Sequence, residues 1–294
     1  MRLLHLSDLH FETRPERLYV GVSSTLNSSW RELRGLGPDL VLVSGDLTSY
    51  GTWDQGQLRG VKRWLDSIGV DYLALPGNHD LGANLDRGFK FPVLERYENV
   101  DWARTNFARV FEQGPVVSKR VAEVEVIAVA LRERDPDGAL AELEEALSRP
   151  GAPVIVAGHY PLSLVRDHGV LATFGSEGFI GPAAGRLASL VLGSERVIAY
   201  LCGHVHAASV VRLSDTILQF SAGALGPGPS RGWLLEVAGG HLSWELVAGS
   251  GPDYFWKGEQ LGGADPADYH LGPSSTWRGR VSFAHRFQEF RLHS

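Results

Sequence analysis

Residues 1–10 read MRLLHLSDLH, a short apolar run that leads into Asp8-Leu9-His10. A run of this length that stops at polar residues is typical of a buried β-strand followed by a loop. We therefore expect a strand over Leu3–Leu6, with Asp8 and His10 in the loop behind it. The same arrangement recurs along the chain, and this recurrence decides the predicted fold.

Four further candidate strands end in polar segments of the same kind. In chain order they are Leu40–Val43 with Gly45-Asp46, Tyr72–Leu75 with Gly77-Asn78-His79-Asp80, Val154–Ala157 with Gly158-His159, and Val197–Leu201 with Gly203-His204-Val205-His206. Open α/β sheets bind ligands beyond the carboxyl ends of their strands, so segments spread over about 200 residues of sequence can meet in space.

The remaining pattern predicts a layered α/β fold. Additional strands are expected over Val124–Ala130 and Ile217–Phe220, with a hairpin of Trp233–Val237 and Leu242–Val247. Amphipathic stretches between the strands predict helices over Ser24–Leu36, Trp53–Ile68, Asp101–Phe111, Gly138–Leu147 and Ala183–Leu192. We expect one catalytic domain over residues 1–248 and, over residues 249–294, a C-terminal arm or lid that is not an independent domain.

Composition narrows the class of protein. The 294 residues are 44% hydrophobic and 21% charged, as in ordinary globular proteins. A net charge of −6 argues against a broad electrostatic grip on nucleic acid, so an anionic ligand must be attracted by something local. Cys202 is the only cysteine, which excludes an intrachain disulfide and a thiolate zinc knot. The first apolar run is too short for a signal peptide and no apolar 18-mer follows, so we expect a cytoplasmic protein without a membrane span.

The polar segments carry residue types that bind metals. Imidazole nitrogens with carboxylate and amide oxygens, and no sulfur, suit Mn, Fe, Zn or Ni better than calcium. A single Asp-x-His or His-x-His is weak evidence, because a buried, hydrogen-bonded histidine is the commoner explanation. Five such segments in one chain reverse that balance.

Taken in order, Asp-x-His, Gly-Asp, Gly-Asn-His-Asp, Gly-His and Gly-His-x-His resemble the signature of the calcineurin-like metallophosphoesterases, over residues 1 to about 206. The resemblance implies a sandwich of two mixed β-sheets flanked by helices. It also implies two divalent metal ions that share Asp46. The implied ligands are Asp8, His10, Asp46 and His206 for one ion, and Asp46, Asn78, His159 and His204 for the other.

This centre favours hydrolysis of a small phosphate ester. Two cations carry +4 against −2 from Asp8 and Asp46, so the site attracts phosphate and acidifies water, and no protein nucleophile is required. By resemblance His79 faces the substrate and stabilises the transition state or protonates the leaving oxygen. Asp80 could fix the tautomer of His79; the alternative is a helix N-cap at Asp80 and a structural His79.

Three other residues are expected to have no part in the reaction. His5 lies inside the first strand, where a hydrogen-bonded core histidine is the simpler interpretation. His168 lies in the loop 162–182 without a recognisable partner, and Cys202 is most simply a small buried apolar residue.

Details of the motifs point to a subfamily. Tyr50 occupies the position of the phosphate-binding arginine of the protein phosphatases, and Ser49 that of the tyrosine ligand of purple acid phosphatases. The run from Gly45 to Gly51 is most similar to class III cyclic-nucleotide phosphodiesterases, which implies small phosphodiesters as substrates. One departure is Gly158-His159-Tyr160-Pro161, where that subfamily commonly has His-His-Pro-Pro.

Several alternatives stay open. They are a phosphomonoesterase or pyrophosphohydrolase of small molecules or lipids, then a nuclease, and last a non-catalytic scaffold. A nuclease is disfavoured because the only basic cluster is in the tail, at Arg278, Arg280, Arg286 and Arg291, and a scaffold because every ligand position is filled. Loops 81–98 and 162–182, with Arg87, Lys90 and Arg166, are expected to set substrate access. The oligomeric state is undetermined, with a homodimer as one alternative.

Overall fold

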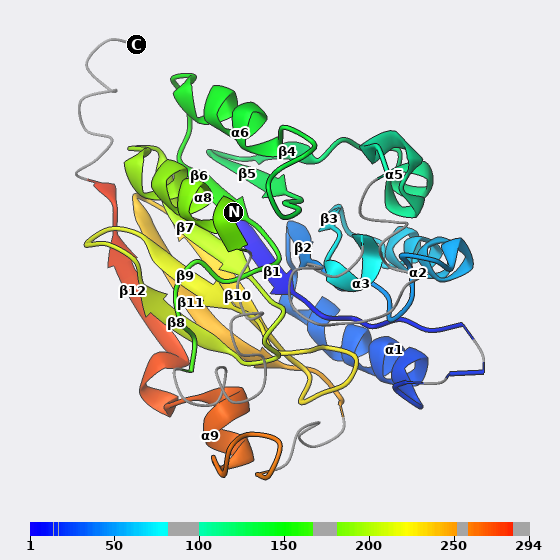
Figure 1. Cartoon of the computed structure of the whole chain (residues 1–294). Helices are drawn as coiled ribbons and strands as arrows, with labels where there is room; N and C mark the ends of the chain where they lie inside the picture. The colour runs from blue at the N-terminus through cyan, green and yellow to red at the C-terminus, as the bar shows by residue number, and fades with distance from the viewer. Residues whose placement is uncertain (14, 17, 82–99, 167–180, 252–257, 285–294) are drawn as a thin grey trace.

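The structure is a computed structural model that describes residues 1–13, 15–16, 18–81, 100–166, 181–251 and 258–284 (Figure 1). Within these ranges, no helix combines the length and the apolar character that crossing a bilayer requires.

Two mixed β-sheets of six strands each form the centre of the molecule, which confirms the predicted fold class. The first sheet has the order β12 (Arg278–Ser282), β11 (His241–Ala248), β10 (Arg231–Ala238), β1 (Arg2–Leu6), β2 (Leu40–Ser44) and β3 (Tyr72–Leu75). The second sheet has the order β4 (Val116–Val121), β5 (Val124–Val129), β6 (Val154–Ala157), β7 (Val197–Cys202), β9 (Leu218–Ser221) and β8 (Ser209–Arg212).

Helices cover the outer faces of both sheets (Figure 1). The α-helices are α1 (Val22–Leu33), α2 (Gln55–Ser67), α3 (Asn78–Leu81), α5 (Asn106–Phe111), α6 (Ala139–Ser148), α8 (Gly181–Gly193) and α9 (Pro266–Leu271), and the 3-10 helices are η1 (Arg34–Leu36), η3 (Trp102–Arg104) and η5 (Ser274–Thr276). The helices α1 and α2 pack on the first sheet, and α6 and α8 pack on the second.

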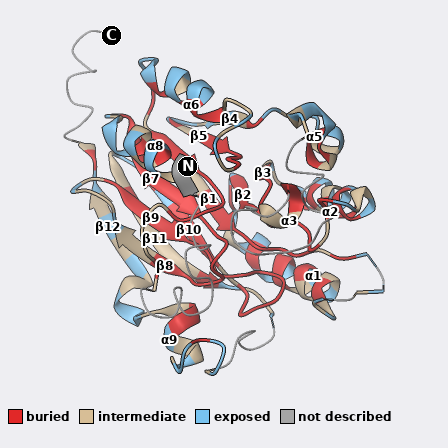
Figure 2. Cartoon of the chain, in the orientation of Figure 1, coloured by how far each residue is buried: buried red, intermediate tan, exposed pale blue. Residues whose placement is uncertain are grey.

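The two-residue period of a strand explains the layers. Leu3 of β1 packs into the core between the sheets, whereas Leu4 and Leu6 face the helix layer. Figure 2 shows the resulting burial of the strands in the middle of both sheets. The parallel strands β1, β2 and β3 are hydrogen-bonded side by side, as are β6 and β7, so the loops that follow them emerge at common edges.

Some predicted elements differ from the observed ones. The helix expected over Asp101–Phe111 is two elements, because Thr105 has an extended backbone with ψ 150° and its side chain caps α5 through the N–H of Ala108. Strands β4, β8 and β12 and the helix α9 were not predicted. The helix α9 begins at the N-cap Asp265 followed by Pro266, a combination that favours a helix start even in a Gly- and Pro-rich stretch.

His5 is fully buried, and its Nε2 lies 2.8 Å from Ser44 Oγ, as expected of a core histidine. Burial lowers the pKa of His5 to about 3, against the opposing influence of Asp8. The folded protein therefore keeps His5 neutral between about pH 3 and 6.5, where the unfolded chain binds a proton. The neutral state of His5 therefore contributes fully to the free energy of unfolding above about pH 6.5, and this contribution is lost as the pH falls towards about 3.

We predict that His5→Gln flattens this acid dependence. Between pH 7.5 and 5 the unfolding free energy of the wild type should fall more steeply than that of the variant, by up to about 1.4 kcal/mol per pH unit. Urea unfolding of both metal-free proteins over this pH range measures the difference. Parallel pH profiles would show that His5 is not held neutral by the fold.

Candidate metal centre

The predicted ligands come from both sheets and meet at the carboxyl ends of the parallel strands. The loop after β1 carries Asp8 and His10, the loop after β2 carries Asp46, and Asn78 is the first residue of α3, which follows β3. In the second sheet, the loop after β6 carries His159 and the loop after β7 carries His204 and His206. Two groups have ligand atoms within 4.8 Å of one another: Asp8 with His10 and His206, and Asp46 with His159 and His204. Each group contains residues from both sheets.

The first group has an unusual donor arrangement. The Nε2 atoms of His10 and His206 face each other at 3.2 Å, and Asp8 Oδ1 lies 3.4 Å from His206 Nε2. Asp8 Oδ2 accepts the backbone N–H of His204, but Asp8 Oδ1 is buried and has no hydrogen-bond partner among the described residues. A buried carboxylate oxygen without a donor, opposite two imidazole nitrogens, is the coordination that a divalent cation would complete.

Asp46 belongs to the second group and also faces the first. Its Oδ2 is 3.3 Å from His159 Nε2 and 3.9 Å from His10 Nε2, while its Oδ1 accepts the backbone N–H of His79. Asn78 joins the second group, because its Oδ1 is 3.1 Å from His159 Nε2. The Nδ1 of His159 donates to the Ser44 carbonyl, which directs Nε2 towards these oxygens. The position of Asp46 therefore suits a bridging carboxylate.

The electrostatics favour ionised aspartates in this buried site. Burial would raise the pKa of Asp46, but His159 and His79 hold it well below its usual range. Burial would raise the pKa of Asp8 as well, and His206 lowers it. The pKa of His10 lies well below its usual range, because it is buried and His79 is close. Burial opposes protonation of His159 too, but Asp46 raises its pKa to about 9.

Five of the seven predicted ligands have a left-handed backbone, which is uncommon in residues other than glycine. They are Asp8 (φ 52°), His10 (φ 46°), Asp46 (φ 47°), His204 (φ 69°) and His206 (φ 52°). The first two are fixed by backbone hydrogen bonds, from Asp8 to the Gly45 carbonyl and from His10 to the Asp46 carbonyl, both 3.0 Å. Strain of this kind concentrates at functional sites, where the surrounding structure enforces it.

Two glycines make room for the carboxylates. A Cβ atom at Gly77 would lie 2.2 Å from Asp46 Oδ1, and one at Gly203 would lie 2.5 Å from Asp8 Oδ2. Either contact is far shorter than a van der Waals separation, so only glycine permits these approaches.

The prediction that Asp80 orients His79 is wrong. His79 Nδ1 is paired with the Ser49 carbonyl at 2.9 Å. The carboxylate of Asp80 instead accepts hydrogen bonds from the backbone N–H groups of Leu47, Thr48 and Gly77 and from the Thr48 hydroxyl. Burial and the nearby Asp46 raise the pKa of Asp80 to about 6. Asp80 thus ties the loop after β2 to the loop after β3.

His79 is close to the two groups of predicted ligands. It forms a third group with His10 and Asp46, again with ligand atoms within 4.8 Å, and its ring meets that of His10 edge-on at 4.9 Å. Because a carbonyl oxygen only accepts, the Nδ1 of His79 carries a hydrogen, and Nε2 is the ring nitrogen that can exchange a proton.

The other sequence candidates have different outcomes. Arg166, expected in a specificity loop, directs its guanidinium to backbone carbonyls, among them Ala208 and Tyr269. Arg87, Lys90 and His168 lie outside the described residues. Cys202 is buried in the outer core of the second sheet, as expected.

Two aromatic residues border the site: Tyr160, which the sequence places next to His159, and Tyr19, which no motif indicated. The ring of Tyr160 packs 4.6 Å from His204 and 5.1 Å from His159, and the ring of Tyr19 packs 4.8 Å from His10. The buried carboxylate of Glu12 accepts the N–H groups of Leu18 and Tyr19 and so holds Tyr19 in place. For Tyr19, the only signal in the sequence was the acidic residue Glu12, two positions after His10.

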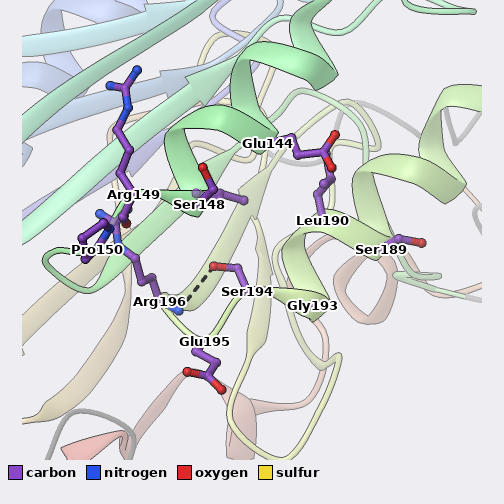
Figure 3. Close-up of a pocket in the computed structure, with 11 residues that line it drawn as sticks. Glu144, Ser148, Arg149, Pro150, Ser189, Leu190, Gly193, Ser194, Glu195 and Arg196 are labelled. Carbon is purple, nitrogen blue, oxygen red and sulfur yellow. Dashed lines mark hydrogen bonds between the residues drawn. The ribbon is translucent and has the colours of Figure 1, made fainter. Parts of the chain in front are cut away.

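A separate hollow of about 490 Å³ lies between the ends of α6 and α8 (Figure 3). Its Arg196 is bound to the carbonyls of Ala146, Arg149 and Ala152 and to Glu125, and therefore holds the layers together. None of the predicted ligands lines this hollow, so it is not the candidate site.

Comparison with known proteins agrees with this geometry. The family model for calcineurin-like phosphoesterases matches residues 1–208. A probable glycerophosphodiester phosphodiesterase of Arcobacter nitrofigilis is 27% identical over 236 residues, which cover 76% of this chain and 78% of that protein. A 3',5'-cyclic-nucleotide phosphodiesterase of Nostoc is 26% identical over 109 residues, which cover 36% and 40%.

Among solved structures, a dimetal phosphatase from Danio rerio superposes with a TM-score of 0.56. The match covers 84% of this chain and 96% of that chain at 10% identity, and it supports the likeness of fold.

We predict that metal binding releases protons. In the metal-free protein the pKa of His159 is about 9, so this imidazole must lose its proton before it can bind a cation. The apparent affinity should rise by up to about tenfold per pH unit between pH 6.5 and 8.5. Calorimetric titration with Mn²⁺ in buffers of different ionisation enthalpy counts the protons released. An affinity that is flat over this range, with no proton release, would contradict the prediction.

Proposed function

The chain belongs to the calcineurin-like phosphoesterase family and is a metal-dependent phosphoester hydrolase, and we propose that it hydrolyses small phosphodiesters at a centre of two divalent metal ions. The observation that carries the proposal is the position of Asp46, whose Oδ2 faces His159 on one side and His10 on the other. The donor set of carboxylate, amide and imidazole groups suits Mn, Fe, Zn or Ni.

We assign Asp8, His10 and His206 to one ion and Asn78, His159 and His204 to the other, with Asp46 shared. When bound, such ions acidify water and neutralise the charge of the phosphoryl group. The chain itself contributes the left-handed loops that direct the ligands, and it buries Asp8 and Asp46 so that their charges are poorly screened. The nucleophile in this proposal is water, since the site requires no covalent protein intermediate.

His79 is the proposed proton donor to the leaving oxygen. Its Nδ1 is occupied by the Ser49 carbonyl and its backbone N–H by Asp46 Oδ1, so the orientation of the ring is fixed from two sides. The side chain is only half-buried, unlike the predicted ligands Asp8 and His206. A substrate can therefore approach Nε2 while the ring stays in place.

The diester class is supported by the relatives, which are named as glycerophosphodiester and cyclic-nucleotide phosphodiesterases. Tyr50 in place of a phosphate-binding arginine also disfavours a protein phosphatase. The second candidate is a phosphomonoesterase or pyrophosphohydrolase of small molecules. Cytoplasmic localisation is proposed from the sequence alone.

Metal replacement tests the proposal. We expect the metal-free protein to be inactive, and Mn²⁺, Zn²⁺, Fe²⁺ or Ni²⁺ to restore hydrolysis of bis-p-nitrophenyl phosphate in preference to p-nitrophenyl phosphate. Glycerophosphodiesters and cyclic nucleotides are then compared as substrates. Asp46→Asn should abolish turnover with every metal because it removes the shared charge, while circular dichroism shows that the fold is kept. A preference for the monoester would favour the second candidate, and a fully active Asp46→Asn would exclude the bridging role.

His79→Ala separates proton donation from metal binding. We expect it to keep both ions and to lower kcat by about 10²- to 10⁴-fold on diesters with an alkyl leaving group. The loss should be smaller with p-nitrophenolate, which leaves without protonation. Metal analysis accompanies the kinetics, and His241→Ala, in the β10–β11 hairpin, is the control. Loss of one ion from His79→Ala would make His79 a ligand, and equal losses on both substrate types would argue against proton donation.

A further inference from the structure

The loop that carries His204 and His206 has a second face, directed away from the metal centre. The two histidines belong to the metal-ligating groups, whereas Val205 and Ala207, which alternate with them, are 0% exposed in a small apolar cluster. The other buried members of this cluster are Val165, Leu261 and Tyr269. The back of the ligand loop is thus covered by Val165 and, from the C-terminal part of the chain, by Leu261 and Tyr269.

Hydrogen bonds from α9 fix the backbone of this loop. The hydroxyl of Tyr269 donates to the Val205 carbonyl at 2.8 Å, and Nδ1 of His270 donates to the His206 carbonyl at 2.9 Å. In return, the N–H of Ala208 donates to the His270 carbonyl at 2.8 Å. Tyr269 is 2% exposed and His270 is 0% exposed, so water does not compete for these bonds.

Arg166 fastens α9 to the far end of the same loop. Its Nε donates to the carbonyls of Asp268 and Tyr269, and its Nη2 donates to the carbonyl of Ala208 at 2.6 Å. A Cβ atom at residue 272 would lie 2.0 Å from Nη2, so Gly272 leaves the space that the guanidinium fills. Charge-assisted bonds of this kind are stronger than neutral ones.

These contacts act where the backbone is strained. His204 and His206 both have a left-handed φ, and the two carbonyls that α9 binds are those of Val205 and His206. A residue in this conformation persists only when its surroundings enforce it. The contacts come from residues 269 and 270, beyond the residues 1–208 that match the family.

We propose that α9 is a positioning element of the metal centre, in which Tyr269 and His270 hold the backbone of the ligand loop so that His204 and His206 can bind metal. This inference rests on the proposed function. Tyr269 and His270 act through the loop and touch neither substrate nor metal. Their loss should therefore weaken metal binding without removing a ligand.

The test compares His270→Leu with His270→Asn. The leucine variant loses the hydrogen bond to the His206 carbonyl, whereas the amide nitrogen of asparagine can replace Nδ1 as donor. The matched control is His241→Leu, because His241 Nδ1 makes the same type of bond, to the Gly239 carbonyl at 2.9 Å, on an exposed turn. Tyr269→Phe removes only the hydroxyl and keeps the ring in the apolar cluster.

We expect His270→Leu to weaken Mn²⁺ binding by about tenfold or more, since partners of metal ligands typically contribute 10- to 100-fold in affinity. His270→Asn should recover most of this loss, Tyr269→Phe should lie between, and His241→Leu should match the wild type. Titration calorimetry with Mn²⁺ measures the affinity well below the unfolding temperature. Hydrogen exchange of the metal-free proteins should show faster exchange at the amide of Ala208 in His270→Leu.

Turnover gives a second signature. Excess Mn²⁺ should restore the kcat of His270→Leu, because the ligands are intact and only their placement is weakened. If His270→Leu binds Mn²⁺ like the wild type, or if saturating metal leaves it inactive, the inference is overturned. Tyr269→Phe carries the same test if His270→Leu does not fold. If the wild type binds no metal, the proposed function and this inference are overturned together. If the wild type is active and the variants match its Mn²⁺ affinity, the inference alone is overturned.

Discussion

The structure depends on the burial of two carboxylates where the two sheets meet. Asp8 and Asp46 are at most 2% exposed, and each faces imidazoles from the opposite sheet. Burying a carboxylate is unfavourable unless opposite charge or hydrogen bonds compensate. The proposed cations would supply that charge. They would also connect the sheets, because the group of Asp8, His10 and His206 and the group of Asp46, His159 and His204 each draw on both sheets.

Residues around the site keep the two carboxylates buried in place. Asp80 ties the loops after β2 and β3 together, and glycines stand where any side chain would displace a carboxylate. Left-handed backbone at five of the predicted ligand positions stores strain of about 1–3 kcal/mol per residue, which the rest of the fold must offset. The packing of the sheets therefore stabilises a left-handed backbone that these loops would not adopt alone.

Much of the fold and of the candidate site could be predicted from the sequence. The elements and side-chain roles that could not be predicted lack a hydrophobic or periodic pattern. Strands β3 and β6 begin and end where predicted, because each is a continuous apolar run that stops at a proline or a glycine. The edge strand β12 reads RGRVS, with alternate residues exposed, and so gave no hydrophobic signal. The role of Asp80 was mistaken because side-chain bonds to distant backbone leave no periodic pattern. For the same reason Tyr269 and His270 were not identified.

The pairing of β1 has a consequence for biosynthesis. This strand lies between β2 and β10, and the amino group of Met1 donates to the carbonyl of Val237, 236 residues further along the chain. At translation rates of roughly 5–20 residues per second, the ribosome needs on the order of 10 seconds or more to deliver that partner. During this interval one edge of an apolar strand is unpaired in the nascent chain, open to other strands. The first sheet can therefore close only late in synthesis, after β10 has been made.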